Sequence, residues 1–180
     1  MIIRTFRRLF LGVFIMFIGQ HGAYAAGNSE YKLGSGDVIS INVYGEDDMS
    51  FKSLRLTDAG TFSYPFIGEV NAKGKTASEI EALLVSELKG DYLVNPRVSV
   101  NVLQYREFYI GGEVKTPGGY PFQPGLTVRR AVALAGGFTE RASEGKISIN
   151  RDLSATPVEK ASLDALVSPG DTITVPQGFF

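Results

Sequence analysis

The sequence predicts an α+β fold built from two small units in succession, at residues 27–104 and 105–180. Short stretches in which apolar and polar residues alternate indicate half-buried strands. Two segments with helical spacing of apolar residues each begin at a threonine, and glycine-rich turns separate the segments. Removal of a predicted leader of 25 residues leaves 155 of the 180, which suits one domain or two small ones.

Strands of the first unit are predicted at residues 38–43, 54–67 and 98–102. The first and last of these alternate apolar with polar side chains, as strands with one buried face do. The long middle stretch contains Asp58-Ala59-Gly60, a turn sequence that predicts a hairpin. A further turn is expected at residues 45–48.

The helix of the first unit is predicted to begin with a capping box. Thr76 stands three residues before Glu79, so the threonine side chain can accept from the Glu79 amide while the carboxylate reaches back. Gly90 is expected to end this helix. The side chains predicted to face inward are Ile80, Leu83, Leu84 and Leu88.

The second unit is predicted to contain a strand at residues 108–114, a turn at 116–119, an extended segment at 120–122 and a strand at 146–151. Thr127 is expected to cap a short helix between them. The expected inward side chains of this helix are Val128, Ala131, Val132 and Leu134, and the closing glycines are Gly136 and Gly137.

Two arginines, Arg129 and Arg130, lie in the first turn of this second helix. The helix dipole disfavours cations at that position. Two interpretations stay open, because the arginines either have an acidic neighbour or partner or are merely solvated.

A Gly-Asp pair opens a strand twice, as Gly36-Asp37 and as Gly170-Asp171. The two are either chance turns or related pieces of a repeated β-unit. Gly34 and Gly36 are predicted to take backbone angles closed to other residues. Asp37 is predicted to accept hydrogen bonds from local amides at the strand entrance.

The first 25 residues are predicted to be a secretory signal peptide. Three arginines precede an apolar stretch at residues 9–18, and Ala23-Tyr24-Ala25 supplies the small residues that a signal peptidase reads. Cleavage is expected after Ala25, which exports the mature chain. An uncleaved anchor is the alternative. The pair Arg7-Arg8 leaves the twin-arginine route open beside the general one.

Composition restricts the chemistry of the mature chain. The full sequence has a formal charge of −1, and the mature chain, without the three arginines of the leader, has −4, so no nucleic-acid partner is expected. The one histidine, His21, lies in the predicted leader, and there is no cysteine. The missing His and Cys exclude a disulfide, a lipid-modified cysteine, structural zinc, haem, iron–sulfur clusters and nucleophiles of the Cys or Ser-His type. Carboxylates, Lys, Ser, Thr and Tyr remain, and among them we expect no metal site, no cofactor site and no catalytic residue.

Taken together, these motifs resemble the outer-membrane polysaccharide export family. The polysaccharide biosynthesis/export domain is resembled at residues 31–39, 58–62, 65–70, the capped helix from 76, and 95–100. The soluble-ligand-binding β-grasp (SLBB) domain is resembled at residues 109–118, 125–128, 133–137 and, for its closing strand, 169–176. The resemblance implies an export domain at 27–104 and an SLBB domain at 105–180.

In that family the matched residues shape turns and are not catalysts. Carried over to this chain, they are Gly34, Gly36, Asp37, Gly68, Gly111, Pro117, Gly118, Gly136, Gly137, Gly170 and Asp171. The resemblance implies a periplasmic, non-enzymatic subunit of a capsule or exopolysaccharide export channel at the outer membrane, acting as a ring-forming conduit or adaptor.

The partners implied by the resemblance are further copies of the chain, an inner-membrane polysaccharide copolymerase and the transported polysaccharide. Large family members carry a lipidated N-terminal cysteine and a C-terminal pore helix, and neither pattern occurs in this sequence. A short form of this kind is expected to need a separate outer-membrane β-barrel.

Two rival functions are a carbohydrate-binding or regulatory module that stays monomeric, and a glycan hydrolase. The hydrolase is disfavoured because no pair of carboxylates is placed to face across a cleft. Candidate saccharide-facing aromatics are Tyr105, Tyr109, Tyr120 and Phe122. Packing in the core is the preferred interpretation for these side chains.

Overall fold

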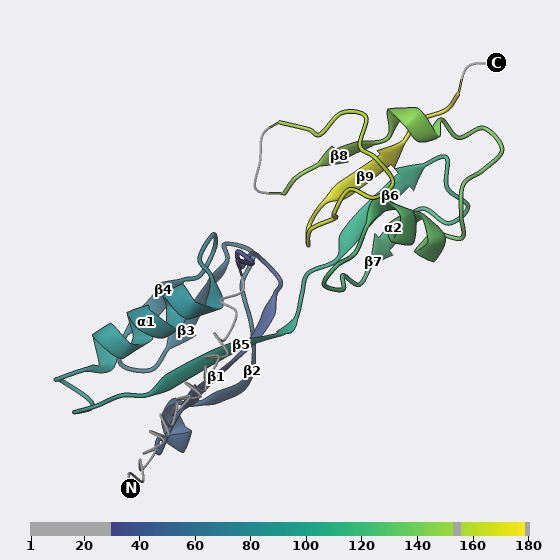
Figure 1. The fold of residues 1–180 in the computed structure, drawn as a ribbon. Helices are drawn as coiled ribbons and strands as arrows, with labels where there is room; N and C mark the ends of the chain where they lie inside the picture. The colour runs from purple at the N-terminus through teal and green to yellow at the C-terminus, as the bar shows by residue number, and fades with distance from the viewer. Residues whose placement is uncertain (1–29, 153–155, 179–180) are drawn as a thin grey trace, which may run out of the picture.

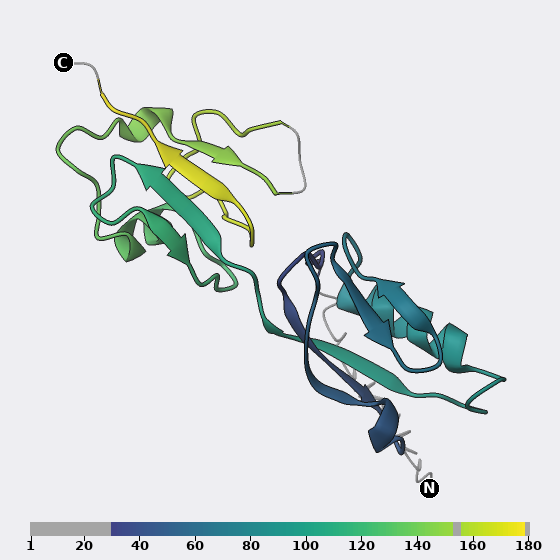
Figure 2. The same cartoon turned by 180° about the vertical axis from the view of Figure 1, so that it is seen from behind.

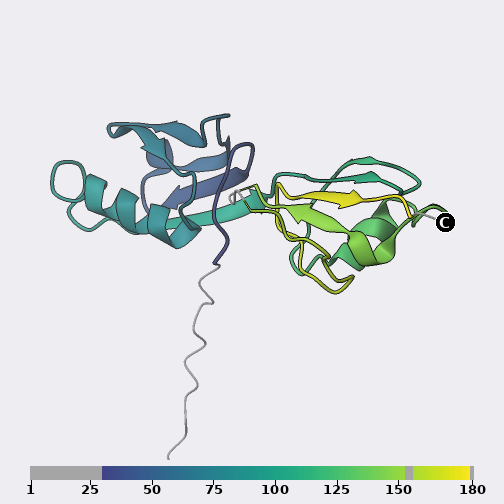
Figure 3. The same ribbon diagram turned by 90° about the horizontal axis from the view of Figure 1, so that it is seen from above.

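Two lobes lying end to end make up the described part of the chain (Figure 1). The structure, a computed structural model, describes residues 30–152 and 156–178. The first lobe, residues 30–104, and the second lobe, residues 108–178, each enclose a core of their own. The view from above shows the same end-to-end arrangement (Figure 3). The predicted signal peptide and its cleavage site after Ala25 lie outside the described residues.

In the described residues, β-sheets with mostly antiparallel pairing occur together with two α-helices, which confirms the α+β prediction. In the first lobe an antiparallel sheet has the strand order β2-β1-β5, and β3 and β4 form a separate two-stranded hairpin. The elements of this lobe are β1 (Val38–Val43), the 3-10 turn η1 (Asp47–Met49), β2 (Phe51–Arg55), β3 (Thr61–Tyr64), β4 (Gly68–Asn71), α1 (Ala77–Leu88) and β5 (Val98–Gln104).

The predicted hairpin at residues 58–60 is wrong. A turn is present there, but the strands on either side of it belong to different sheets, since β2 pairs with β1 and β3 pairs with β4. The Gly36 amide donates to the Leu56 carbonyl and Leu56 is buried, so the end of β2 stays on β1. The true hairpin turn lies at residues 65–67, where Pro65 has no amide to donate to a ladder.

The capping box of α1 is confirmed. Thr76 Oγ1 accepts from the Glu79 amide at 3.1 Å, and the Glu79 carboxylate accepts from the Thr76 amide at 2.6 Å. The inward stripe of Ile80, Leu84 and Leu88 is completely buried, and each such side chain contributes about 1.5–3 kcal/mol relative to exposure. Gly90 follows the helix with a φ of 97°.

In the second lobe a four-stranded sheet has the order β7-β6-β9-β8, with β6 and β9 parallel and the other pairs antiparallel. Figure 2 shows this sheet from behind. The elements are β6 (Phe108–Gly112), β7 (Gly118–Tyr120), α2 (Val128–Leu134), the 3-10 turn η2 (Glu144–Lys146), β8 (Ser148–Asn150) and β9 (Thr172–Val175). Within the described residues, no helix has the length and apolar character needed to cross a membrane.

Helix α2 begins at its predicted cap, with Thr127 accepting from the Arg130 amide. Leu134 was predicted to face inward but is half exposed. The buried stripe runs through Val128, Ala131, Val132 and Ala135. Leu134 lies six residues after Val128, a spacing that places it outside the stripe. Arg129 Nη2 lies 3.2 Å from Asp164 Oδ1. The interpretation that the arginines have an acidic neighbour therefore holds for Arg129.

Candidate functional site

A buried carboxylate, that of Asp37, stands where the two lobes meet. Its Oδ2 accepts from the Gly34 amide at 2.8 Å and from the Tyr31 hydroxyl at 2.5 Å. Its Oδ1 accepts from the amide of Arg106 at 2.8 Å. The Gly34 bond is the local one that turn chemistry predicts. The Arg106 bond comes from a residue 69 positions away and ties the connecting segment, residues 105–107, to the first lobe.

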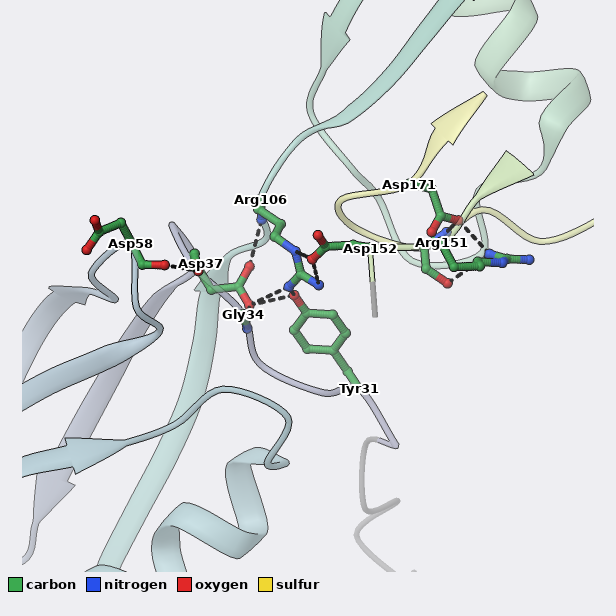
Figure 4. Close-up of polar contacts among 10 residues, drawn as sticks. Tyr31, Gly34, Asp37, Asp58, Arg106, Arg151, Asp152 and Asp171 are labelled. Atoms are coloured by element: carbon green, nitrogen blue, oxygen red, sulfur yellow. Dashed lines mark hydrogen bonds and ion pairs between the residues drawn. The ribbon is translucent and has the colours of Figure 1, made fainter. Parts of the chain in front are cut away.

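The guanidinium of Arg106 binds both lobes at once (Figure 4). Nη1 lies 3.1 Å from Asp37 Oδ2 and donates to the Tyr31 hydroxyl oxygen at 2.6 Å. Nε and Nη2 lie 3.1 Å and 3.0 Å from Oδ2 of Asp152 in the second lobe. The planar fork of arginine suits such two-sided pairing. One side chain therefore links a carboxylate of each lobe.

A backbone bond pins the connecting segment to the second lobe as well. The Gly170 amide donates to the Glu107 carbonyl at 2.9 Å, directly before β9. The Arg106 amide is held by Asp37 on the other side. Because neighbouring residues of the connection are bonded to different lobes, the relative orientation of the lobes is constrained at this point.

Two glycines leave room for Arg106. A Cβ built on Gly34 would lie 2.5 Å from Arg106 Nη1, and one on Gly170 would lie 2.7 Å from Arg106 Nε. Gly36 has a φ of 85°, as predicted. For Gly34 the predicted reason is wrong, because its φ lies outside the left-handed region. The close approach of the guanidinium is what excludes a side chain there.

The turn at Asp171 repeats the turn at Asp37. Asp171 Oδ2 accepts from the Ser168 amide at 2.7 Å, three residues earlier, as Asp37 does from Gly34. Asp171 is also buried and pairs with an arginine, Arg151, at 2.5 Å. Each aspartate follows a glycine of positive φ and precedes a central strand. This shared pattern favours the interpretation of a repeated β-unit.

Burial is the largest influence on the pKa of two side chains of the junction, Tyr31 and Asp171. It raises the pKa of the Tyr31 hydroxyl, and the hydrogen bond and charge of Asp37 raise that pKa further while Arg106 opposes them. The hydroxyl therefore stays protonated and keeps donating to Asp37. Burial also raises the pKa of the Asp171 carboxyl, against the Ser168 amide and Arg151, which favour the charged form.

A cavity of about 290 Å³ lies beside Arg106 and takes its walls from both lobes. Charges of both signs line it together with Tyr31; the charged residues are Glu30, Lys32, Arg106, Arg151, Asp152 and Asp171. Balanced donors and acceptors suit a ligand rich in hydroxyl groups better than a strongly charged one. Within the residues described, no three side chains of the metal-binding types converge.

Aromatic rings bridge the two cores beside this cavity. Tyr105 of the connecting segment makes edge contacts with Tyr31 at 4.8 Å and with Phe122 at 5.4 Å, measured between ring centroids. Tyr31 packs against the core of the first lobe and Phe122 against that of the second. Tyr120 stacks on buried Phe108. These three candidate aromatics are thus partly buried packing residues.

Tyr109, the fourth candidate aromatic, lies on β6 and is 51% exposed. The remaining predicted turn residues also lie away from the junction. Gly68 starts β4, Gly111 lies in β6 and Gly118 starts β7; Pro117 precedes that strand, and Gly136 and Gly137 follow α2. The junction thus gathers the turns of Asp37 and Asp171, together with Tyr31, Arg106, Arg151 and Asp152, which the sequence did not single out.

Comparison with known families identifies the two lobes. A family model described as polysaccharide biosynthesis/export protein matches residues 25–103, and a model of the SLBB domain matches residues 108–160. The chain belongs to the polysaccharide export family. The resemblance seen in the sequence is confirmed, and the two family domains occur in the predicted order.

Members of the polysaccharide export family are similar to most of this chain. It is 32% identical to exopolysaccharide production protein ExoF of Rhizobium meliloti, over 89% of this chain and 44% of the relative. It is 26% identical to EPS I polysaccharide export outer membrane protein EpsA of Ralstonia nicotianae, over 87% and 50%. It is 29% identical to polysialic acid transport protein KpsD of Escherichia coli, over 72% and 24%. The chain spans about half, or less, of these relatives.

Proposed function

We propose that this chain is a subunit of a machine that exports an exopolysaccharide or capsular polysaccharide through the cell envelope. It acts in the periplasm at the outer membrane as a ring-forming conduit or adaptor. The relatives named for polysaccharide production, export and transport support this role. We take residues 27–104 and 105–180 as its two domains.

The observation that carries the proposal is the link that Arg106 makes between the two family domains. A closed ring of identical subunits needs two different contact patches on each subunit, held at a constant angle. The ion pairs of Arg106 with Asp37 and Asp152 constrain that angle. A subunit with free lobes would close into rings of many sizes or remain open.

The proposal includes export of the chain after cleavage at Ala25. Its partners are an inner-membrane polysaccharide copolymerase and an outer-membrane β-barrel, which remain predictions. It also includes the absence of enzymatic activity, in keeping with the names of the relatives. Incubation with the host's secreted glycan is expected to release no new reducing ends, and release of them would contradict this part.

A second candidate is a monomeric carbohydrate-binding or regulatory module. The cavity of about 290 Å³ between the lobes favours this alternative. Positively and negatively charged side chains line it, and together they can donate hydrogen bonds to a small polar ligand and accept them from it. Under this alternative the two lobes form the walls of a ligand-binding site, and the protein forms no conduit.

Two experiments test the proposal. Deletion of the gene is expected to abolish secretion of the polysaccharide, with restoration by the full chain; normal secretion in the deletion strain would contradict an export role. The native mass of residues 26–180 is then measured with and without the periplasmic part of the copolymerase. A discrete multimer in either condition supports the conduit, and a monomer in both favours the binding module.

A further inference from the structure

An exposed aromatic pair lies on the first lobe, away from the junction. Phe66, in the turn between β3 and β4, is 63% exposed, and Tyr92, in the connection between α1 and β5, is 44% exposed. Their ring centroids are 5.2 Å apart, with the ring planes tilted by 37°. Figure 1 shows the α1–β5 connection at the end of the first lobe that points away from the second.

The backbone of Phe66 is in a conformation that favours glycine. Its φ is 68°, and the Ile67 amide donates to the Pro65 carbonyl at 2.8 Å, which closes a γ-turn with Phe66 at its centre. Non-glycine residues in this region are strained and occur preferentially at functional sites. Stability alone would favour glycine at this position. The presence of phenylalanine despite the strain therefore indicates that its ring has a function.

The two rings are held in place before any ligand arrives. The Tyr92 hydroxyl donates to the Phe66 carbonyl at 3.3 Å, and this bond joins the two loops that carry the rings. The tight turn leaves the Phe66 backbone little freedom. Binding of a ligand on the pair therefore costs little conformational entropy, because the loops are already ordered. A small contact area can then suffice for binding.

The two rings alone offer too little area for a stable protein contact. At these exposures the two side chains offer roughly 200 Å² of surface, whereas a stable protein contact takes about 800 Å² from each partner. A sugar ring fits this area. Its C–H bonds, polarised by neighbouring oxygens, are attracted to the negative faces of aromatic rings. The Tyr92 hydroxyl can also accept a hydrogen bond from a sugar hydroxyl.

We propose that the pair Phe66–Tyr92 is a stacking platform for sugar rings of a polysaccharide chain. This inference rests on the proposed export function and adds a contact point for the transported chain. The platform is open and shallow, so each contact is weak. Weak contacts suit transport, because a chain that moves past a site must bind and also leave.

The test is a titration followed by two-dimensional NMR. The probe is a set of short oligosaccharides released by partial hydrolysis from the polysaccharide that the host secretes. Shifts are expected at the amides of Phe66, Ile67 and Tyr92. Phe66→Gly is expected to weaken binding about tenfold or more, the effect of losing one stacking contact, and to unfold at the same temperature or higher because the strain is relieved. Tyr44→Ala removes another exposed ring and serves as the matched control, with unchanged binding expected.

Each other outcome overturns the inference. Shifts confined to the junction cavity or to Tyr109 would place the sugar elsewhere, and unchanged binding by Phe66→Gly would remove the ring from the contact. If the native mass of the protein grows with concentration and is lower for Phe66→Gly than for wild type, the pair is a contact between copies of the chain. If the Phe66→Gly variant shows one of these results while gene deletion still abolishes secretion, the platform fails and the export function stands.

Discussion

Arg106 and Asp37, 69 residues apart in the sequence, form an ion pair of 3.1 Å in which the Asp37 side chain is completely buried and the Arg106 side chain is 11% exposed. The same guanidinium reaches Asp152 in the second lobe at 3.0 Å. The pair is therefore a structural element of the first lobe and also its link to the second. Removal of single partners separates these two roles.

Arg106→Met is expected to destabilise the first lobe by about 3–5 kcal/mol, because it leaves a buried carboxylate without its cation. Urea unfolding of the purified mature protein measures the change. The double variant Asp37→Asn with Arg106→Met is expected to recover much of the loss, since no buried charge remains. A cost below about 1 kcal/mol for the single variant would show that the amides and Tyr31 suffice for Asp37.

Gly34→Ala is expected to cost about 1–3 kcal/mol, the range for a forced overlap in a packed site. The added methyl group would lie 2.5 Å from Arg106 Nη1 and displace the guanidinium. Gly118→Ala is the matched control, because Gly118 has an ordinary φ and nothing within 4 Å of its would-be Cβ. Equal thermal stabilities of the two variants would argue against a tight fit of Arg106 over Gly34.

Asp152→Ala is expected to change the free energy of unfolding by only about 0–1 kcal/mol, because an exposed partner contributes little to an ion pair. The Asp152 side chain is 43% exposed, in contrast to buried Asp37. Asp164→Ala, which removes the exposed partner of Arg129, provides a comparison of the same kind. A loss as large as that of Arg106→Met would make the second-lobe contact the main stabilising one.

The capping box of α1 is expected to give stability that depends on pH. The Thr76 amide, and then Lys32, lower the pKa of Glu79 below its ordinary 4.5. A carboxyl with a lowered folded-state pKa stabilises the fold above its unfolded pKa, and this contribution is lost as the pH falls through the folded value. Thermal unfolding over a pH series should therefore show wild type and Glu79→Gln converging in acid. A constant difference down to well below pH 4.5 would exclude this contribution.

Local chemistry was predictable from the sequence. The capping box at Thr76 and the bond from the Gly34 amide to Asp37 each depend on residues three positions apart, so the pattern carries the geometry. The strand pairing after β2 was not predictable from local sequence, because the turn at residues 58–60 suits a hairpin between β2 and β3. The burial of Leu56 keeps the end of β2 on β1 instead.

The junction was predictable only in part, because its main contacts are long-range. Arg106 is near Asp37 in space and far from it in sequence, and no periodic pattern joins the two. One signal was present in the repeated Gly-Asp turns. An aspartate that opens a central strand becomes buried and then requires a cation. Both aspartates find an arginine, Arg106 for Asp37 and Arg151 for Asp171.

The most direct test of the account measures the distance distribution between spin labels on the two lobes. The chain has no cysteine, so Ser86→Cys on α1 and Ala133→Cys on α2, both exposed, place one label on each lobe. A single narrow distribution is expected with Arg106 present and a broad one in Arg106→Met. A broad distribution with Arg106 present, or the same narrow one without it, would contradict the claim that Arg106 sets the orientation of the two lobes.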